Sequence, residues 1–216
     1  MGWFIHRFAM PAFLVTLGGM FFARGLAFAV SEESVGINHR LYRELFSEGW
    51  RLSERVQVPV TAMVFVVVAA AGMILAHWTR FGRYVYAVGG NESSAVLMGL
   101  PVGRTKVIVY GLNGFCAALA GVVATFFMSS GNPALGAGLE LDVIAAVVIG
   151  GTLLSGGVGT VAGSLVGVLI YGTIQGVVLF DGRFNSWWVR IVMGVLLLMF
   201  IVLQRFLQKR QFLAAG

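Results

Sequence analysis

The stretch VPVTAMVFVVVAAAGMILAHW, residues 58–78, contains no Asp, Glu, Lys or Arg. A helix needs about 20 consecutive apolar residues to cross the hydrocarbon core of a bilayer. This stretch reaches that length, and soluble domains do not normally contain so long a run without charge. It therefore predicts a transmembrane helix, and with it a membrane protein.

The composition of the whole chain agrees with that prediction. Of its 216 residues, 58% are hydrophobic and 11% are charged, whereas soluble domains carry about 25% charged residues. The net charge is +6, but the basic residues lie between apolar runs, which argues against a nucleic-acid partner. One cysteine, Cys116, and three scattered histidines exclude an internal disulfide and show no metal-ligand spacing. We expect no metal site and no cofactor.

Five further apolar runs flank the first, at residues 11–30, 107–128, 141–154, 161–180 and 187–203. The run at 141–154 is short, so it is tilted, re-entrant or broken at Gly150 and Gly151. No Pro/Ser-rich linker or low-complexity tract separates the runs. We therefore predict one all-α domain over residues 1–216, a polytopic bundle of about six transmembrane helices.

Lysine and arginine on the short loops predict the orientation in the membrane. The loop at 79–106 carries four basic residues and the tail at 204–216 carries three, whereas the loop at 131–140 has none. The loop at 31–57 has four arginines among five acids and runs against this rule. Both termini and the 79–106 loop are placed in the cytoplasm. Because successive spans cross in opposite directions, the loop SGGVGT, residues 155–160, falls on the same side.

Glycines recur at every fourth position around the run at 161–180. They are Gly159, Gly163 and Gly167, and Gly172 and Gly176 repeat the spacing. Positions four apart share one helix face, and in lipid a face of small residues lets a second helix approach closely. Glycine is common in membrane helices generally, but five on this spacing favour close helix packing.

The stretch GGNESSAVLMGLPVGRTK, residues 89–106, predicts a short amphipathic helix within the cytoplasmic loop. Asn91 can cap its N-terminus, and Glu92 is favourable in its first turn. Pro101 ends the helix at about Leu100. A helix of two to three turns is marginal alone, so it needs a partner surface.

One face of this short helix combines Ala95, Met98 and Gly99. That small apolar patch fits either a groove on another protein or the lipid interface. The sequence pattern alone leaves both open.

Several motifs resemble those of the ribose-type sugar permeases of ABC importers. They are TLGGMFFARGLAF (16–28), GRYVYAVGGNESSAVLMGL (82–100) and GLELDVIAAVVIGGTLLSGGVGTVAGSLVGVLI (138–170). Within that family, SEESVGINH (31–39) and FDGRFNSWW (180–188) look most like the galactofuranose-type permeases. The resemblance covers nearly all of the chain.

The resemblance implies a BtuC-like, type II all-helical permease that imports a ribose- or galactofuranose-like monosaccharide across a bacterial inner membrane. Its implied partners are a separate ABC ATPase, a second homologous permease, a periplasmic sugar-binding protein and membrane lipid. The short helix would be the coupling helix, with Ala95 and Gly99 in closest contact with the ATPase. Branched-chain amino-acid permeases share the general plan, so another small solute is an alternative.

The chain departs from the family at its start. Family members carry a further block of spans, with a Gly-Gly-x-Asp-Leu-Ser-type motif, before the region that Pro11 begins. MGWFIHRFAMPAF, residues 1–13, resembles the end of such a span and its loop. We therefore expect a truncated permease, and an inactive membrane scaffold is a further alternative.

The residues show no catalytic chemistry. No G-x-x-x-x-G-K-[ST] motif is present to cradle ATP phosphates, so a separate subunit would supply the energy. Four polar residues are candidates for a solute path: Asn113, Glu140, Asp142 and Gln175. Asn113 and Gln175 can equally bridge helices. A passive or ion-coupled transporter would carry acids within its spans, whereas Glu140 and Asp142 lie at the end of one.

Overall fold

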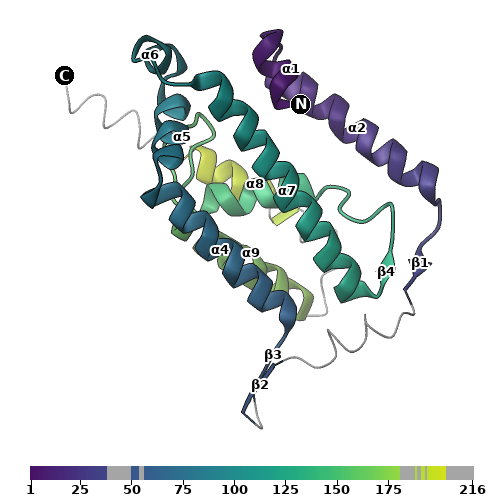
Figure 1. The fold of residues 1–216 in the computed structure, drawn as a ribbon. Helices are drawn as coiled ribbons and strands as arrows, with labels where there is room; N and C mark the ends of the chain where they lie inside the picture. The colour runs from purple at the N-terminus through teal and green to yellow at the C-terminus, as the bar shows by residue number, and fades with distance from the viewer. Residues whose placement is uncertain (38–49, 54–55, 181–187, 189–190, 193, 203–216) are drawn as a thin grey trace. The chain divides into compact units, whose positions relative to one another are not determined.

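The computed structural model describes residues 1–37, 50–53, 56–180, 188, 191–192 and 194–202, and its elements are labelled in Figure 1. Four helices in this described part are long and apolar enough to cross a bilayer. They are α2 (Ala12–Val30), α4 (Val60–Trp78), α7 (Val102–Met128) and α9 (Val161–Phe180). The prediction of an all-α, polytopic membrane protein is therefore confirmed.

The fourth predicted span is a half-length helix. Helix α8 (Leu139–Ile149) has 11 residues, or about 16 Å at 1.5 Å per residue, against a hydrocarbon core of about 30 Å. It ends where Gly151 adopts φ 87°. The Gly151 N–H donates to the Val148 carbonyl (2.9 Å) and the Thr152 N–H to the Val147 carbonyl (3.2 Å). This pattern is a Schellman motif, which a glycine closes because it tolerates left-handed backbone.

Two other predicted spans need comment. Helix α7 begins at Val102 rather than at residue 107. The more polar residues that follow Pro101 form its first turn, ahead of the apolar run. The last predicted span, residues 187–203, lies partly outside the described residues.

The described chain forms two compact units, and the first comprises residues 1–71 and 93–135. In it, the short helix α1 (Gly2–Arg7) packs on the start of α7. A Cβ at Gly2 would lie 3.0 Å from the Val107 Cα, and the His6 ring lies directly against Gly103. The chain start and the start of α7 therefore lie at the same end of this unit.

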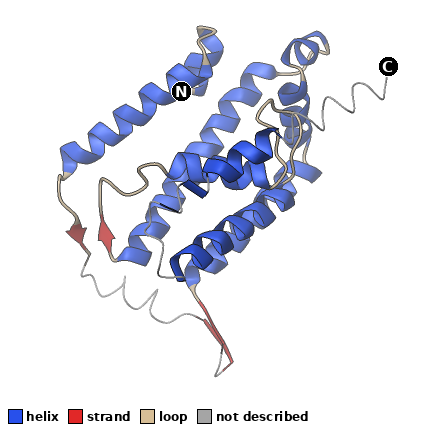
Figure 2. Ribbon diagram, turned by 180° about the vertical axis from the view of Figure 1, so that it is seen from behind, coloured by secondary structure: helices blue, strands red, loops and turns tan. Residues whose placement is uncertain are grey.

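A short ladder closes the opposite end of the first unit. Strand β1 (Val35–Gly36), which follows α2, pairs antiparallel with β4 (Ser130–Gly131), which follows α7. Figure 2 shows the two arrows side by side. Helices α2 and α7 thus run in the same direction, as the predicted topology requires. A second hairpin, β2 (Trp50–Ser53) with β3 (Val56–Val58), leads into α4.

The second unit comprises residues 72–92 and 136–216. It contains a sharp corner between α4 and α5 (Arg80–Gly90), built around Thr79. The Thr79 hydroxyl donates to the Leu75 carbonyl (2.6 Å) and accepts the Gly82 N–H (3.1 Å), which caps α5. Gly82 is buried against the Ala76 carbonyl, where a side chain would not fit. The corner therefore holds α5 firmly to the end of α4.

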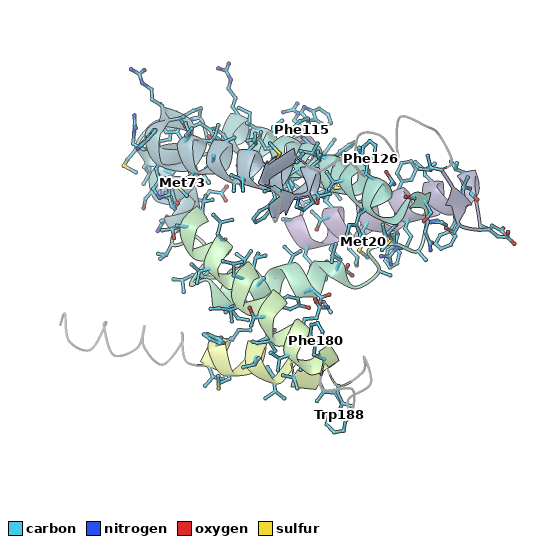
Figure 3. The ribbon with its side chains drawn as sticks, turned by 90° about the horizontal axis from the view of Figure 1, so that it is seen from below. Met20, Met73, Phe115, Phe126, Phe180 and Trp188 are labelled. Carbon is cyan, nitrogen blue, oxygen red and sulfur yellow. The ribbon has the colours of Figure 1, made fainter. Side chains whose placement is uncertain are left out.

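Helices α8 and α9 pack within this same unit. Ala145, Ala146 and Val148 of α8 are buried, and the Ala146 carbonyl lies against Gly167 of α9. By contrast, α2 and α4 have no buried residue. Figure 3 shows the side chains that stand out from the helices, among them Phe115, whose side chain is 67% exposed. Apolar surface of this extent suits contact with lipid or with further helices.

Candidate functional site

The predicted amphipathic helix is present as α6 (Glu92–Leu97), and it is shorter than predicted. The Gly99 N–H donates to the Val96 carbonyl (2.9 Å), and the Leu100 N–H donates to the Ala95 carbonyl (3.1 Å). Gly99 has φ 73°. These bonds form a second Schellman motif, so Gly99 is needed for the left-handed turn that ends α6.

The exposed apolar surface of α6 differs from the face that the sequence predicted. Ala95 is fully buried, whereas Val96, Leu97 and Met98 are 57%, 88% and 66% exposed. We call these three exposed residues the α6 surface. Of the three residues on the predicted face, Met98 belongs to this surface. Ala95 is buried and cannot contact a partner, and Gly99 contributes its backbone conformation.

Asn91 and Glu92 lie at the start of α6. Asn91 directly precedes the helix with extended backbone, φ −156° and ψ 106°, which is the conformation of an N-cap residue. Glu92 lies in the first turn, where a negative charge is favourable. Asn91 is also the C-cap residue of α5, so it is the single residue between α5 and α6.

Helix α5 is bound at its far end to the loop between α8 and α9. The Tyr86 hydroxyl donates to the Gly159 carbonyl, 2.9 Å away. A Cβ at Gly89 would lie 2.8 Å from the Gly157 backbone nitrogen, so the two backbones touch. The contact is compatible with the predicted placement of this loop on the same side of the membrane as the 79–106 loop. The contact itself was not predicted, and its only sign in the sequence is the pair of glycines at each of 89–90 and 156–157.

The glycines that recur at every fourth position divide into a group that contacts other described residues and a group that does not. Gly163 and Gly167 lie against the Gly150 and Ala146 carbonyls of α8. Gly159 lies before α9, against the Thr152 side chain. A Cβ at Gly172 or Gly176 would meet no described atom within 4 Å. Contact between α8 and α9 therefore occupies only the first half of the glycine face.

The four candidate path residues lie on three helices. Glu140 is exposed and Asp142 is half-buried in the first turn of α8, and Gln175 is exposed on α9. Asn113 is exposed on α7. Their role in a solute path stays a prediction. In the described residues, no group of three His, Cys, Asp or Glu side chains forms a metal-binding arrangement.

The first unit contains a groove of about 360 Å³ between α4 and α7. Its lining is almost entirely apolar, from Phe65 and Val68 on α4 to Leu119 and Phe127 on α7. A sugar site needs several hydrogen-bonding groups to replace water. The groove is therefore unsuited to a sugar.

Comparison with known proteins identifies related chains. The family model described as branched-chain amino acid transport system / permease component matches residues 1–201. The inner membrane ABC transporter permease protein YjfF of Escherichia coli is 49% identical over 205 residues, which is 95% of this chain and 62% of that protein.

Two further relatives carry the names of sugars. The fructose import permease protein FruG of Bifidobacterium longum is 39% identical, over 94% of this chain and 62% of that protein. The ribose import permease protein RbsC of Bacillus subtilis is 38% identical, with the same two shares, 94% and 62%. The chain thus spans less than two thirds of the length of these relatives. No solved structure matches. The apolar helices and these relatives indicate a multi-pass inner-membrane protein.

Proposed function

Because the chain belongs to the family of branched-chain amino acid transport system permease components, we propose that it is the membrane-spanning permease part of an ATP-driven importer. Its solute is a ribose- or galactofuranose-like monosaccharide. The names of the fructose and ribose import permeases support a sugar. The family description supports a branched-chain amino acid as the second candidate.

One observation supports a partner ATPase above all others. Three large apolar side chains, the α6 surface, stand exposed at the end of a six-residue helix, within a basic loop between two spans. Burying one such side chain in a partner groove contributes about 1.5–3 kcal/mol. We assign the α6 surface as the docking point for a separate ATPase subunit, within the coupling loop at residues 79–106.

The proposed topology places both termini and the coupling loop in the cytoplasm. The basic residues of that loop support this orientation. The arrangement of the first unit supports placing α1 and the start of α7 on one side and the β1–β4 pair on the other. A second permease and a periplasmic binding protein complete the proposed importer. Within this chain, residues 1–216 form one permease domain in this proposal.

The docking proposal is tested with Leu97→Glu, and Ser93→Glu is the matched control. Both variants add the same charge to an exposed position of α6, but only Leu97 belongs to the α6 surface. In the complete permease, we expect Leu97→Glu to weaken co-purification of the importer's ATPase about tenfold or more. Ser93→Glu should leave it unchanged.

The alternative, in which α6 rests on lipid, predicts a different result. A charge at position 97 would then lower membrane association of the loop and leave ATPase recovery unchanged. Equal ATPase recovery for Leu97→Glu and Ser93→Glu would therefore contradict docking. Uptake of labelled ribose, galactofuranose and leucine then separates the sugar from the amino-acid candidate.

A further inference from the structure

At Gly89 and Gly90, the contact between α5 and the α8–α9 loop is a contact between backbones. A Cβ at Gly89 would lie 2.8 Å from the Gly157 nitrogen, and one at Gly157 would lie 2.5 Å from the Gly90 Cα. One at Gly156 would lie 2.7 Å from the Gly89 carbonyl oxygen. No side chain separates the two segments at this point. We call Gly89, Gly156 and Gly157 the glycine clamp.

Tyr86 closes the clamp one turn earlier on α5. Its hydroxyl donates to the Gly159 carbonyl (2.9 Å), and its ring meets His77 edge to face at 6.4 Å. The same side chain therefore contacts the end of α4 and the α8–α9 loop. Together with the Thr79 corner, it leaves α5 little freedom to move alone.

The loop on the other side of the clamp is itself tightly bonded. The Leu153 N–H donates to the Val158 carbonyl (3.0 Å), and the Gly156 N–H donates to the Leu153 carbonyl (3.0 Å). Thr160 caps α9 by accepting the Gly163 N–H (3.0 Å). Loop movement is therefore passed to the ends of α8 and α9.

A contact between backbones transmits displacement better than a contact between side chains. Side chains absorb small shifts by changing rotamer, whereas packed backbones move together or separate. Only Asn91 lies between α5 and α6. A force on α6 therefore reaches the clamp through a single residue.

We propose that the glycine clamp is the mechanical link between ATPase docking at α6 and the half-length helix α8 with its partner α9. The proposal rests on the function proposed above, because it requires that an ATPase moves α6. It assigns to Gly89, Gly156, Gly157 and Tyr86 a role in coupling rather than in docking or solute binding. Breaking the clamp should uncouple ATP hydrolysis from transport without releasing the ATPase.

Two adjacent glycines of α5 provide the matched test. Gly89→Ala places a methyl group against the Gly157 backbone, whereas a Cβ at Gly90 meets no described atom within 4 Å. The variants are made in the complete importer, reconstituted in liposomes. We expect Gly89→Ala to keep ATPase co-purification and hydrolysis but to lower solute uptake about tenfold. Gly90→Ala should match the unmodified importer in all three measurements.

Tyr86→Phe provides a second variant that adds no atoms and removes only the hydroxyl bonded to Gly159. It should lower uptake per ATP hydrolysed about twofold to tenfold. If Gly89→Ala transports as well as Gly90→Ala, the clamp does not couple. If Gly89→Ala fails to assemble and Tyr86→Phe couples normally, the clamp is structural only and the proposal is wrong. Failure of the unmodified permease to recover an ATPase would overturn the proposed function itself, and with it this inference.

Discussion

Gly167 of α9 lies directly against the carbonyl oxygen of Ala146 in α8, with no side chain between the two helices. Gly163 makes the same kind of contact with Gly150 one turn earlier on α9. In lipid, where apolar surface drives helix association weakly, such close approach favours dispersion between backbones. The last turn of α8 is thus held by two glycines of its neighbour.

Gly167→Ala should destabilise this contact, because its methyl group would overlap the Ala146 carbonyl. Overpacking of this kind costs about 1–3 kcal/mol. The control is Gly172→Ala on the same helix, where a Cβ meets no described atom within 4 Å. It should be neutral or stabilising by up to about 1 kcal/mol, since alanine favours helix. Thermal unfolding in detergent measures both, and equal midpoints would contradict the contact.

Gly99→Ala should loosen the end of α6. A non-glycine residue at φ 73° strains the backbone by about 1–2 kcal/mol. Asn tolerates this conformation better, so Gly99→Asn should lie between alanine and the native residue. Amide hydrogen exchange of residues 92–100 should accelerate most in the alanine variant. Faster exchange in Gly99→Asn than in Gly99→Ala would refute a requirement for left-handed backbone.

Thr79→Val should weaken the corner between α4 and α5 by about 1 kcal/mol, through the loss of an N-cap. Thr173→Val is the control. Both hydroxyls donate to the carbonyl four residues earlier, at 2.6 Å for Thr79 and 2.7 Å for Thr173. Only Thr79 also accepts a backbone N–H, that of Gly82. Protease sensitivity near residue 79 should rise in Thr79→Val alone, and an equal rise in both variants would count against capping.

The topology predicts which cysteines an impermeant reagent can reach. In a Cys116→Ser background, Val35→Cys in β1 should be labelled from outside the cell, and Leu97→Cys in α6 should not. Both native side chains are well exposed, at 53% and 88%, so access is limited by the membrane rather than by burial. Permeabilised cells should label both. Labelling of Leu97→Cys in intact cells would invert the topology and remove α6 from an ATPase.

The long apolar runs predicted the four spanning helices well, because hydrophobic length alone decides them. Hydrophobic length does not predict the half-length of α8, since its apolar run continues to Leu154 while the helix ends at Ile149. What ends it is the left-handed backbone of Gly151. A glycine in an apolar run does not reveal its backbone angle. The sequence therefore pointed to a break at Gly150 and Gly151, but not to a helix of only half the length of a span.

The face of α6 shows a different limit. Spacing placed Ala95 and Gly99 on one side of a helix, but it did not tell which side the rest of the chain covers. The helix also ends before Gly99, so the assumed periodicity no longer applies there. The bond between Tyr86 and Gly159 joins residues 73 positions apart, and no local pattern in the sequence predicts it.

The two left-handed glycines, Gly99 and Gly151, have a consequence at the level of the gene. A single base change in a glycine codon yields Ala, Val, Ser, Cys, Arg, Trp, Glu or Asp, and Asn requires more than one. Of those eight, only Asp adopts positive φ with some ease, and its charge is unfavourable at a helix C-terminus. Random single-base mutagenesis should therefore find almost no neutral replacement at either codon. The codon for exposed Leu97, two positions before Gly99, should accept many replacements unless the partner of α6 is present.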